Sequence, residues 1–346
     1  MPRTTGIWLR AEAAPDERRT PLVPADAAEL VAAGVPVTVE DAPQRAFPAA
    51  QYARAGCRVV PANSWPEADP EQTVLGLKEP VSPPAALTHQ HVFFGHAYRD
   101  QRGGPALLRR FTDGGGTLLD LEYLTDADGR RVTAFGYFAG YVGAALAVLQ
   151  QRGELTAPLT ATTAERLDAA LRARQGGARA LVIGALGRSG RGALRALAVA
   201  GVPATAWDQA ETQQLDRPAL LAHDLLVNAV APAAPGPPFL TAGDAERADR
   251  ALTVVADVTC DVTSDRNRLP VNDRVTDWAR PARRLRGDPP LDVIAVDNLP
   301  SLLPRESSTA FSAGLLPHLA ALPGGSPVWE RAAAAFRHAL ATTDHP

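Results

Sequence analysis

The segment that most restricts the fold of this chain lies in its second half, where a strand, a glycine-rich turn and a helix follow one another. Residues 180–183 form a short apolar run, 184–190 read Gly-Ala-Leu-Gly-Arg-Ser-Gly, and 191–200 have helical character. Such a bare turn lets backbone N–H groups and the helix dipole approach a pyrophosphate. The order of these elements therefore predicts the phosphate site of a doubly wound α/β domain.

The next strand, 203–207, carries a second signal at its end, because it stops at Asp208. An acidic residue at this place accepts hydrogen bonds from the ribose hydroxyls of NAD and repels the 2′-phosphate of NADP. The G-x-x-G-x-x-G spacing departs by one residue from the common G-x-G-x-x-G motif, so the strand and the acid make the prediction more specific. We expect NAD as the cofactor.

Later apolar runs fit the same sheet. Residues 224–230, 251–256 and 291–296 are continuous apolar segments, as expected of strands that are covered on both faces. The second run leads into Asp257-Val258-Thr259, and the third leads into Asp297-Asn298-Leu299-Pro300. Polar groups thus reach the edge where open α/β sheets bind their ligands.

Lys78 is the only lysine of the chain, and the other 34 cationic side chains are arginines. A GC-rich genome explains the drift of surface cations to arginine. A lysine persists best where a group must lose and regain a proton, since arginine stays charged throughout the accessible pH range. Lys78 is therefore a candidate acid/base group, although one lysine codon that escaped the drift by chance also explains it.

The surroundings of Lys78 favour the chemical interpretation. The run 74–77 reads as a buried strand that ends at Lys78-Glu79-Pro80, and the run 91–95 ends in the same way at His96. If these two strands are parallel neighbours in one sheet, Lys78 and His96 lie side by side at its ligand-binding edge.

Composition excludes several functional classes. The 346 residues are 46% hydrophobic and 21% charged, which is typical of a globular chain with room for two cores of about 150 residues each. A net charge of -3 without a basic cluster argues against nucleic acid as a partner. The N-terminus lacks an apolar signal region, and no apolar run has membrane-spanning length, so we expect a cytoplasmic protein.

Cysteine and histidine usage does not predict a metal site. Cys57 and Cys260 are too few for a zinc site or a disulfide framework, and we interpret both as small core residues. His89 and His91 have no acidic or cysteine partner at ligand spacing, so core or surface packing is the better interpretation.

Several motifs, in order along nearly the whole chain, resemble one family. They are 9–12 and 17–24, Gly76-Leu77-Lys78-Glu79, 96–101, Asp120-Leu121-Glu122, 129–136, 184–188 and 297–306. The chain resembles the NAD-dependent, L-lysine-forming saccharopine dehydrogenases, within the superfamily of alanine dehydrogenase and the soluble part of transhydrogenase.

This resemblance implies an α/β fold of two Rossmann-like lobes, each with a doubly wound, mostly parallel sheet, and an interdomain cleft. The substrate lobe would span 1–136, completed by 304–346, and the NAD lobe 137–303. Two apolar segments, 136–151 and 307–322, would be helices that join the lobes. No oligomeric state follows from the sequence, and a monomer is compatible with it.

The implied reaction is the oxidation of saccharopine by NAD to lysine and 2-oxoglutarate, or its reverse. A secondary amine must lose its proton before hydride leaves the adjacent carbon, and the resulting imine must then take up water. By resemblance, Lys78 serves the amine step and His96 the imine hydrolysis. Glu79 and Glu122 would tune both groups, although each of them could simply pair with an arginine.

The resemblance also assigns the binding residues. Substrate carboxylates would meet Arg19, whose planar fork matches a carboxylate, and the rest of the substrate site would be Lys78, Gln101, Phe135, Asp257, Val258 and Thr259. The NAD site would consist of Arg130, Gly187, Arg188, Asp208, Thr212, Ala231, Ala256, Val296, Asp297, Asn298 and Leu299.

Two other functions stay open at this point. A relative that joins a different amino acid to a 2-oxo acid, an opine-type or amino-acid dehydrogenase, fits a GC-rich bacterial origin. A non-catalytic NAD-binding module fits the superfamily, but the presence of Lys78, His96 and Arg19 argues against it.

Overall fold

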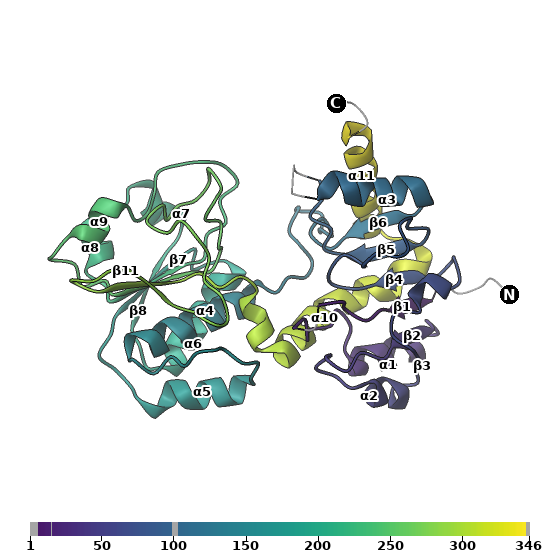
Figure 1. The fold of residues 1–346 in the computed structure, drawn as a ribbon, viewed down its shortest axis with the longest axis horizontal. Helices are drawn as coiled ribbons and strands as arrows, with labels where there is room; N and C mark the ends of the chain where they lie inside the picture. Colours follow the sequence, from purple (N-terminus) through teal and green to yellow (C-terminus); the bar gives the residue numbers. More distant parts are fainter. Residues whose placement is uncertain (1–5, 15, 99–102, 344–346) are drawn as a thin grey trace. The chain divides into compact units, whose positions relative to one another are not determined.

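The chain forms two compact units, each built on one sheet. The structure is a computed structural model that describes residues 6–14, 16–98 and 103–343. The first unit comprises Met1–Ala134 and Pro304–Pro346, and the second comprises Phe135–Leu303. Each unit contains a six-stranded sheet with helices on both faces (Figure 1). The expected α/β class with two doubly wound, mostly parallel sheets is confirmed.

The sheet of the first unit has the order β3-β2-β1-β4-β5-β6, and all of its pairs are parallel. Its strands are β1 (Ile7–Leu9), β2 (Val37–Glu40), β3 (Arg58–Val60), β4 (Thr73–Leu75), β5 (Gln90–Phe93) and β6 (Thr117–Asp120). Its helices are α1 (Pro24–Ala32), α2 (Ala49–Arg54), α3 (Gly104–Gly114), α10 (Pro304–Ala321) and α11 (Pro327–Thr343), with short 3₁₀ turns at Trp65–Glu67 and Leu322–Gly324. Every strand is short, and most strand residues are buried, as expected of a parallel sheet covered on both faces, whereas Arg58 and Val59 of the edge strand β3 are exposed.

The second unit has the strand order β11-β12-β10-β9-β7-β8, with only β11 antiparallel. Its strands are β7 (Ala180–Ile183), β8 (Ala204–Trp207), β9 (Leu225–Asn228), β10 (Val254–Asp257), β11 (Arg283–Arg286) and β12 (Leu291–Ile294). Its helices are α4 (Gly136–Gln151), α5 (Ala164–Ala173), α6 (Arg188–Val199), α7 (Gln209–Gln213), α8 (Arg217–Leu221) and α9 (Ala242–Glu246), with a 3₁₀ turn, η2, at Leu299–Leu302.

Helices α4 and α6 pack so closely that their backbones leave no room for a Cβ at two glycines. A Cβ added at Gly140 of α4 would overlap the carbonyl of Ser189, and one added at Gly192 of α6 would overlap the carbonyl of Tyr137. The small side chains of the 136–151 run therefore allow close helix packing. The helix expected over 136–151 is present as α4. The other expected helix, 307–322, is also found, as α10.

Two predicted boundaries differ from the structure. The run 251–256 enters its strand only at Val254, because the N–H groups of Ala251 and Leu252 donate to the carbonyl of Leu221 instead of a neighbouring strand. Helix α6 begins at Arg188 rather than Arg191, because Gly187 ends the turn and accepts the helical hydrogen bond from Arg191 N. Within the described ranges, no helix is long and apolar enough to span a bilayer.

Candidate active site

The glycine-rich turn of the second unit leaves a helix N-terminus without a side-chain cap. Gly184 has a φ of +83°, in the left-handed region, and a Cβ at Gly190 would overlap the carbonyl of Gly184. Gly187 is the N-cap of α6, and no side chain caps this end of the helix. The arrangement fits a pyrophosphate, because uncapped N–H groups and the helix dipole are left for an anion. Arg188, another predicted contact, is the first residue of the helix.

Asp208 follows β8 and ties this turn to the next element. One carboxylate oxygen accepts from Leu186 N at 2.9 Å, and the other accepts from Gln209 N at 2.9 Å. Beside it lies a cavity of about 590 Å³ lined by Asp208, Gln209, Thr212, Gln213, Val230, Pro232, Ala233, Pro237, Phe239 and Arg268. Thr212, a predicted NAD contact, thus shares the cavity with Asp208, and Ala231 lies exposed between two lining residues. The Asp208 carboxylate, the glycine-rich turn that it binds and the adjacent cavity together fit the ribose of an adenosine.

Loops at the carboxyl ends of β10 and β12 carry the next predicted residues. Asp257 is 1% exposed, and its Oδ1 accepts from Asn228 Nδ2 at 3.1 Å and from Thr259 Oγ1 at 2.8 Å. Burial raises the pKa of Asp257, while the hydrogen bonds from Thr259 and Asn228 oppose the shift. Val258 N donates to the carbonyl of Asn228 at 3.0 Å, so the loop is fixed to β9.

The loop after β12 turns sharply before η2. Asn298 has a φ of 66° and is the N-cap of η2. Val296 and Leu299 are buried in the apolar core of the unit with Ala256, whereas Asp297 is exposed. These predicted NAD residues therefore lie at the ends of two neighbouring parallel strands, β10 and β12.

In the first unit, the acid/base candidates follow adjacent strands. Lys78 lies three residues beyond β4 and His96 three residues beyond β5, and these strands are parallel neighbours. The side chains of both residues are exposed. His96 Nδ1 is 3.4 Å from Glu122 Oε2, just after β6. The hydrogen bond with Glu122 raises the pKa of His96, against burial and the nearby charge of Lys78.

Asp120, at the end of β6, is a residue that the sequence analysis did not assign to the site. Its carboxylate accepts from Glu122 N at 2.8 Å and from Gly95 N at 3.2 Å, so it fixes the backbone next to both members of the His96–Glu122 pair. Burial raises the pKa of Asp120 to about 6. The signal was present in the sequence, because Asp120 is a charge at a strand end, like Lys78.

Two predicted residues have other partners. The Arg19 fork binds Glu17, with Nε at 2.8 Å and Nη2 at 2.6 Å from its two carboxylate oxygens. Burial opposes ionisation of Glu17, but the hydrogen bond and charge of Arg19 outweigh it and lower the pKa. The guanidinium of Arg19, which we expected to bind a substrate carboxylate, thus binds the Glu17 carboxylate in this structure. Glu79 pairs with Arg110 at 2.8 Å, which is the arginine alternative considered above.

The remaining predicted residues are placed as follows. Arg130 belongs to the first unit, is exposed, and contacts Asp128 at 3.2 Å across a turn. Phe135 is half-buried immediately before α4. Gln101 lies outside the described residues. Both cysteines are free thiols, and the described ranges contain no cluster of three or more metal-ligating side chains.

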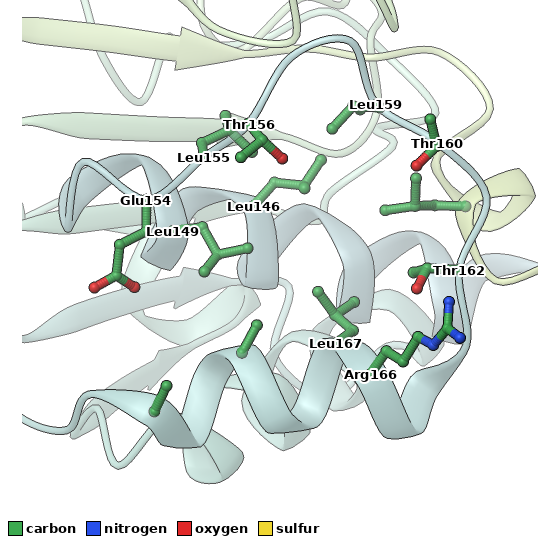
Figure 2. Close-up of a pocket in the computed structure, with 13 residues that line it drawn as sticks. Leu146, Leu149, Glu154, Leu155, Thr156, Leu159, Thr160, Thr162, Arg166 and Leu167 are labelled. Carbon is green, nitrogen blue, oxygen red and sulfur yellow. The ribbon is translucent and has the colours of Figure 1, made fainter.

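A further cavity lies in the second unit, between α4, α5 and the segment that joins them (Figure 2). It measures about 390 Å³, and leucines such as Leu146, Leu149 and Leu167 form its apolar wall. Figure 2 shows Glu154 and Arg166 at opposite ends of it. None of the predicted site residues lines this cavity.

Comparisons with known proteins agree with the fold. The sequence model of the alanine dehydrogenase/PNT N-terminal domain matches residues 8–142. An L-alanine dehydrogenase structure superposes with a TM-score of 0.69 at 18% identity, covering 95% of this chain and 93% of that one. A transhydrogenase from Sinorhizobium meliloti gives a TM-score of 0.64 at 16% identity, covering 91% and 94%.

Curated relatives are similar over almost their whole length. The saccharopine dehydrogenase [NAD(+), L-lysine-forming] of Neurospora crassa is 40% identical, over 98% of this chain and 97% of its own. The Schizosaccharomyces pombe protein of the same name is 39% identical, over 94% and 96%. These relatives, which match nearly all of the chain, place it among the NAD-dependent oxidoreductases that act on CH–NH groups. Within that class, the chain belongs to the family of NAD⁺-dependent, L-lysine-forming saccharopine dehydrogenases.

Proposed function

We propose that this protein catalyses the NAD-dependent oxidation of saccharopine to L-lysine and 2-oxoglutarate, or the reverse reductive amination, with Lys78 and His96 as its acid/base groups. The observation that carries the proposal is their position at the ends of the adjacent parallel strands β4 and β5, with Glu122 beside His96 at 3.4 Å. Support also comes from the two relatives that match 98% and 94% of this chain, since both are named saccharopine dehydrogenase [NAD(+), L-lysine-forming].

The chemistry assigns separate work to the two groups. Lys78 takes the proton from the secondary amine, which frees the nitrogen lone pair before the C–H bond breaks. Bound NAD supplies the hydride acceptor. His96 then takes a proton from the water that adds to the imine carbon and returns it to the nitrogen of the resulting carbinolamine. The C–N bond breaks as the carbinolamine hydroxyl loses its proton to solvent, which releases lysine and 2-oxoglutarate. The exposure of both side chains leaves them accessible to substrate and water.

The residues of the second unit fit the cofactor. The uncapped N-terminus of α6 would hold the pyrophosphate, and Asp208 with Thr212 would hold the adenosine ribose beside the cavity of about 590 Å³. Ala231 and the 296–299 loop of this unit are also proposed as NAD contacts, and so is Arg130, which belongs to the first unit. Arg19 would bind a substrate carboxylate only by sharing or leaving its pairing with Glu17.

The test compares two substitutions of the lone lysine. Lys78→Arg keeps the charge but cannot deprotonate, so it should lose nearly as much turnover as Lys78→Met. Turnover should fall about 10²–10⁴-fold, the usual range for general acid/base catalysis. The Kd for NADH, measured by fluorescence titration, should stay unchanged. If the arginine variant keeps most of its turnover, Lys78 only holds charge and the proposed role is wrong.

A substrate panel separates this function from the alternative of a different amino-acid partner. Amino acids are supplied in turn with 2-oxoglutarate and NADH, and NADH oxidation is followed by absorbance. Lysine should give the highest kcat/KM. A higher value with another amino acid would identify an opine-type or amino-acid dehydrogenase.

A further inference from the structure

A buried ion pair lies directly beneath the backbone of Lys78. Arg10 and Glu12 follow β1, which pairs with β4 in parallel, and they are 2% and 7% exposed. Arg10 Nη1 is 3.4 Å from Glu12 Oε2. Because the removal of ions from water is unfavourable, a buried pair of this kind needs further hydrogen bonds to be tolerated.

Those further bonds go to the residues that carry the candidate base. Glu12 Oε1 accepts from Leu77 N at 2.6 Å, and Glu12 Oε2 accepts from Lys78 N at 3.1 Å. Arg10 Nη2 donates to the carbonyl oxygen of Lys78. The Arg10–Glu12 pair thus binds both the N–H and the C=O of Lys78, while the side chain of Lys78 remains exposed.

The surrounding residues hold the pair in this position. Arg45 Nη2 donates to the carbonyl of Arg10 at 3.0 Å, and Gln44 Nε2 donates to the carbonyl of Glu12 at 2.7 Å. Gly76 leaves the space that the guanidinium occupies, since a Cβ there would lie 2.6 Å from three Arg10 atoms. The glycine before Leu77-Lys78 is therefore needed for the close approach of Arg10.

We propose that Arg10 and Glu12 are positioning residues that fix the Lys78 backbone, so that its ammonium is presented at one place for proton transfer. They act through Lys78 and need not touch substrate or cofactor. The proposal rests on the proposed function of Lys78. Misplacement of a catalytic group by about 1 Å can cost about 10²-fold in rate, which sets the size of effect to expect.

The experiment is a double-mutant cycle with kcat as its readout. Glu12→Gln retains shape but has only one oxygen for the two N–H groups and no charge for Arg10. It should lower kcat about 10- to 100-fold in the natural background, with the KM for NAD within about twofold. In the Lys78→Met background, measured at high enzyme concentration, the same change should cost less than about twofold.

Asp292→Asn is the matched control. Asp292 is a buried carboxylate of the second unit that pairs with Arg284 at 2.5 Å and accepts from Gln150 Nε2 at 2.9 Å, rather than binding Lys78 or the Arg10–Glu12 pair. Its substitution should lower Tm at least as much as Glu12→Gln does, and any loss of kcat should be the same in both backgrounds. If Glu12→Gln does not fold, Arg10→Lys replaces it, because this change keeps the charge and removes the fork that reaches the Lys78 carbonyl.

The outcomes are distinguishable. A loss from Glu12→Gln that disappears in the Lys78→Met background supports positioning. An equal loss in both backgrounds overturns positioning but leaves the role of Lys78 standing. Full turnover in Lys78→Met alone overturns the role of Lys78, and the positioning proposal with it.

Discussion

Glu79 and Glu122 flank the two acid/base candidates, but they contact different cations. Glu122 lies 3.4 Å from His96, whereas Glu79 lies 2.8 Å from Arg110. The guanidinium of Arg110 also donates to the carbonyls of Pro80 and Pro84, so it holds the segment after Lys78 in place. Of these two glutamates, only Glu122 is therefore expected to influence the protonation of His96.

Glu122→Gln should lower the pKa of His96, because the hydrogen bond that raises it becomes one to a neutral amide. At a given pH, less of His96 is then protonated, so any rate limb that follows His96 moves to lower pH. NMR titration of the His96 ring protons measures the shift directly. Glu79→Gln is the control and should leave the titration in place, and equal shifts in both variants would contradict this assignment.

His91 is a second histidine whose surroundings shift its pKa. Its ring is fully buried beside Trp65 and Phe111, and neither ring nitrogen has a hydrogen-bond partner among the described residues. Burial, with the charges of Arg10, His89 and Arg110, lowers the pKa of His91 to about 3. This packing role agrees with the interpretation of His91 as a core residue.

The consequence is a loss of stability in acid. Because the unfolded chain binds a proton at His91 below about pH 6.5 and the folded chain does not, stability falls as pH drops from about 6.5 toward 3, by about 2 kcal/mol at pH 5. His91→Phe should remove this part of the pH dependence. Urea unfolding of both proteins at pH 7 and pH 5 tests it, and parallel losses in the two would contradict it.

At the scale of elements, the contact between α4 and α6 sets the position of the phosphate-binding turn. Ser189, whose carbonyl faces Gly140, belongs to the glycine-rich turn and to the first residues of α6. A side chain that separates the two helices must therefore also move the N-terminus of α6. Packing and cofactor binding are coupled at this point.

Gly140→Ala should destabilise the protein by about 1–3 kcal/mol, the usual cost of overpacking, and should weaken NADH binding. Gly243→Ala is the matched control, because its Cβ would meet nothing closer than 3.9 Å within α9. Replacing glycine by alanine in an open helical position stabilises by up to about 1 kcal/mol. Urea unfolding and NADH fluorescence measure both effects, and unchanged NADH affinity in a destabilised Gly140→Ala would refute the coupling.

Elements were predictable from the sequence where the signal is local. The glycine turn, the acid at Asp208 and the apolar strands each occupy a few consecutive residues, and the structure contains all of them. Contacts between distant residues gave no such signal. Glu12 binds Lys78 across 66 positions. Glu17 and Arg19 are only two residues apart, but their pairing depends on the conformation of an irregular segment, which no sequence pattern specified. Charges at strand ends were informative, but their partners were set by tertiary packing.

At the scale of the whole molecule, the cofactor preference should be visible in thermal stability. A ligand at about 100 times its Kd stabilises the folded state by about 2.7 kcal/mol. NADH should therefore raise Tm, and NADPH at the same concentration should raise it much less, because its 2′-phosphate faces the Asp208 carboxylate. Asp208→Asn keeps an acceptor for Leu186 N and should reduce the difference between the Tm shifts caused by NADH and NADPH. Equal shifts with both cofactors in the natural protein would show that Asp208 does not discriminate.

Strand β11, the antiparallel strand of the second unit's sheet, affects the tendency of this chain to aggregate with other copies of itself. It lies at the edge of its sheet, has a register irregularity between Arg284 and Arg286, and reads Arg-Arg-Leu-Arg. A sheet edge with unpaired N–H and C=O groups is a template on which another chain can add a strand. The interrupted register opposes such growth through poor alignment. Arg283, Arg284 and Arg286 pair with Asp273, Asp292 and Glu246, so the edge carries charged and hydrated side chains that an added strand would have to desolvate. The arginine enrichment of this chain thus protects an edge that a flat apolar strand would leave open to aggregation.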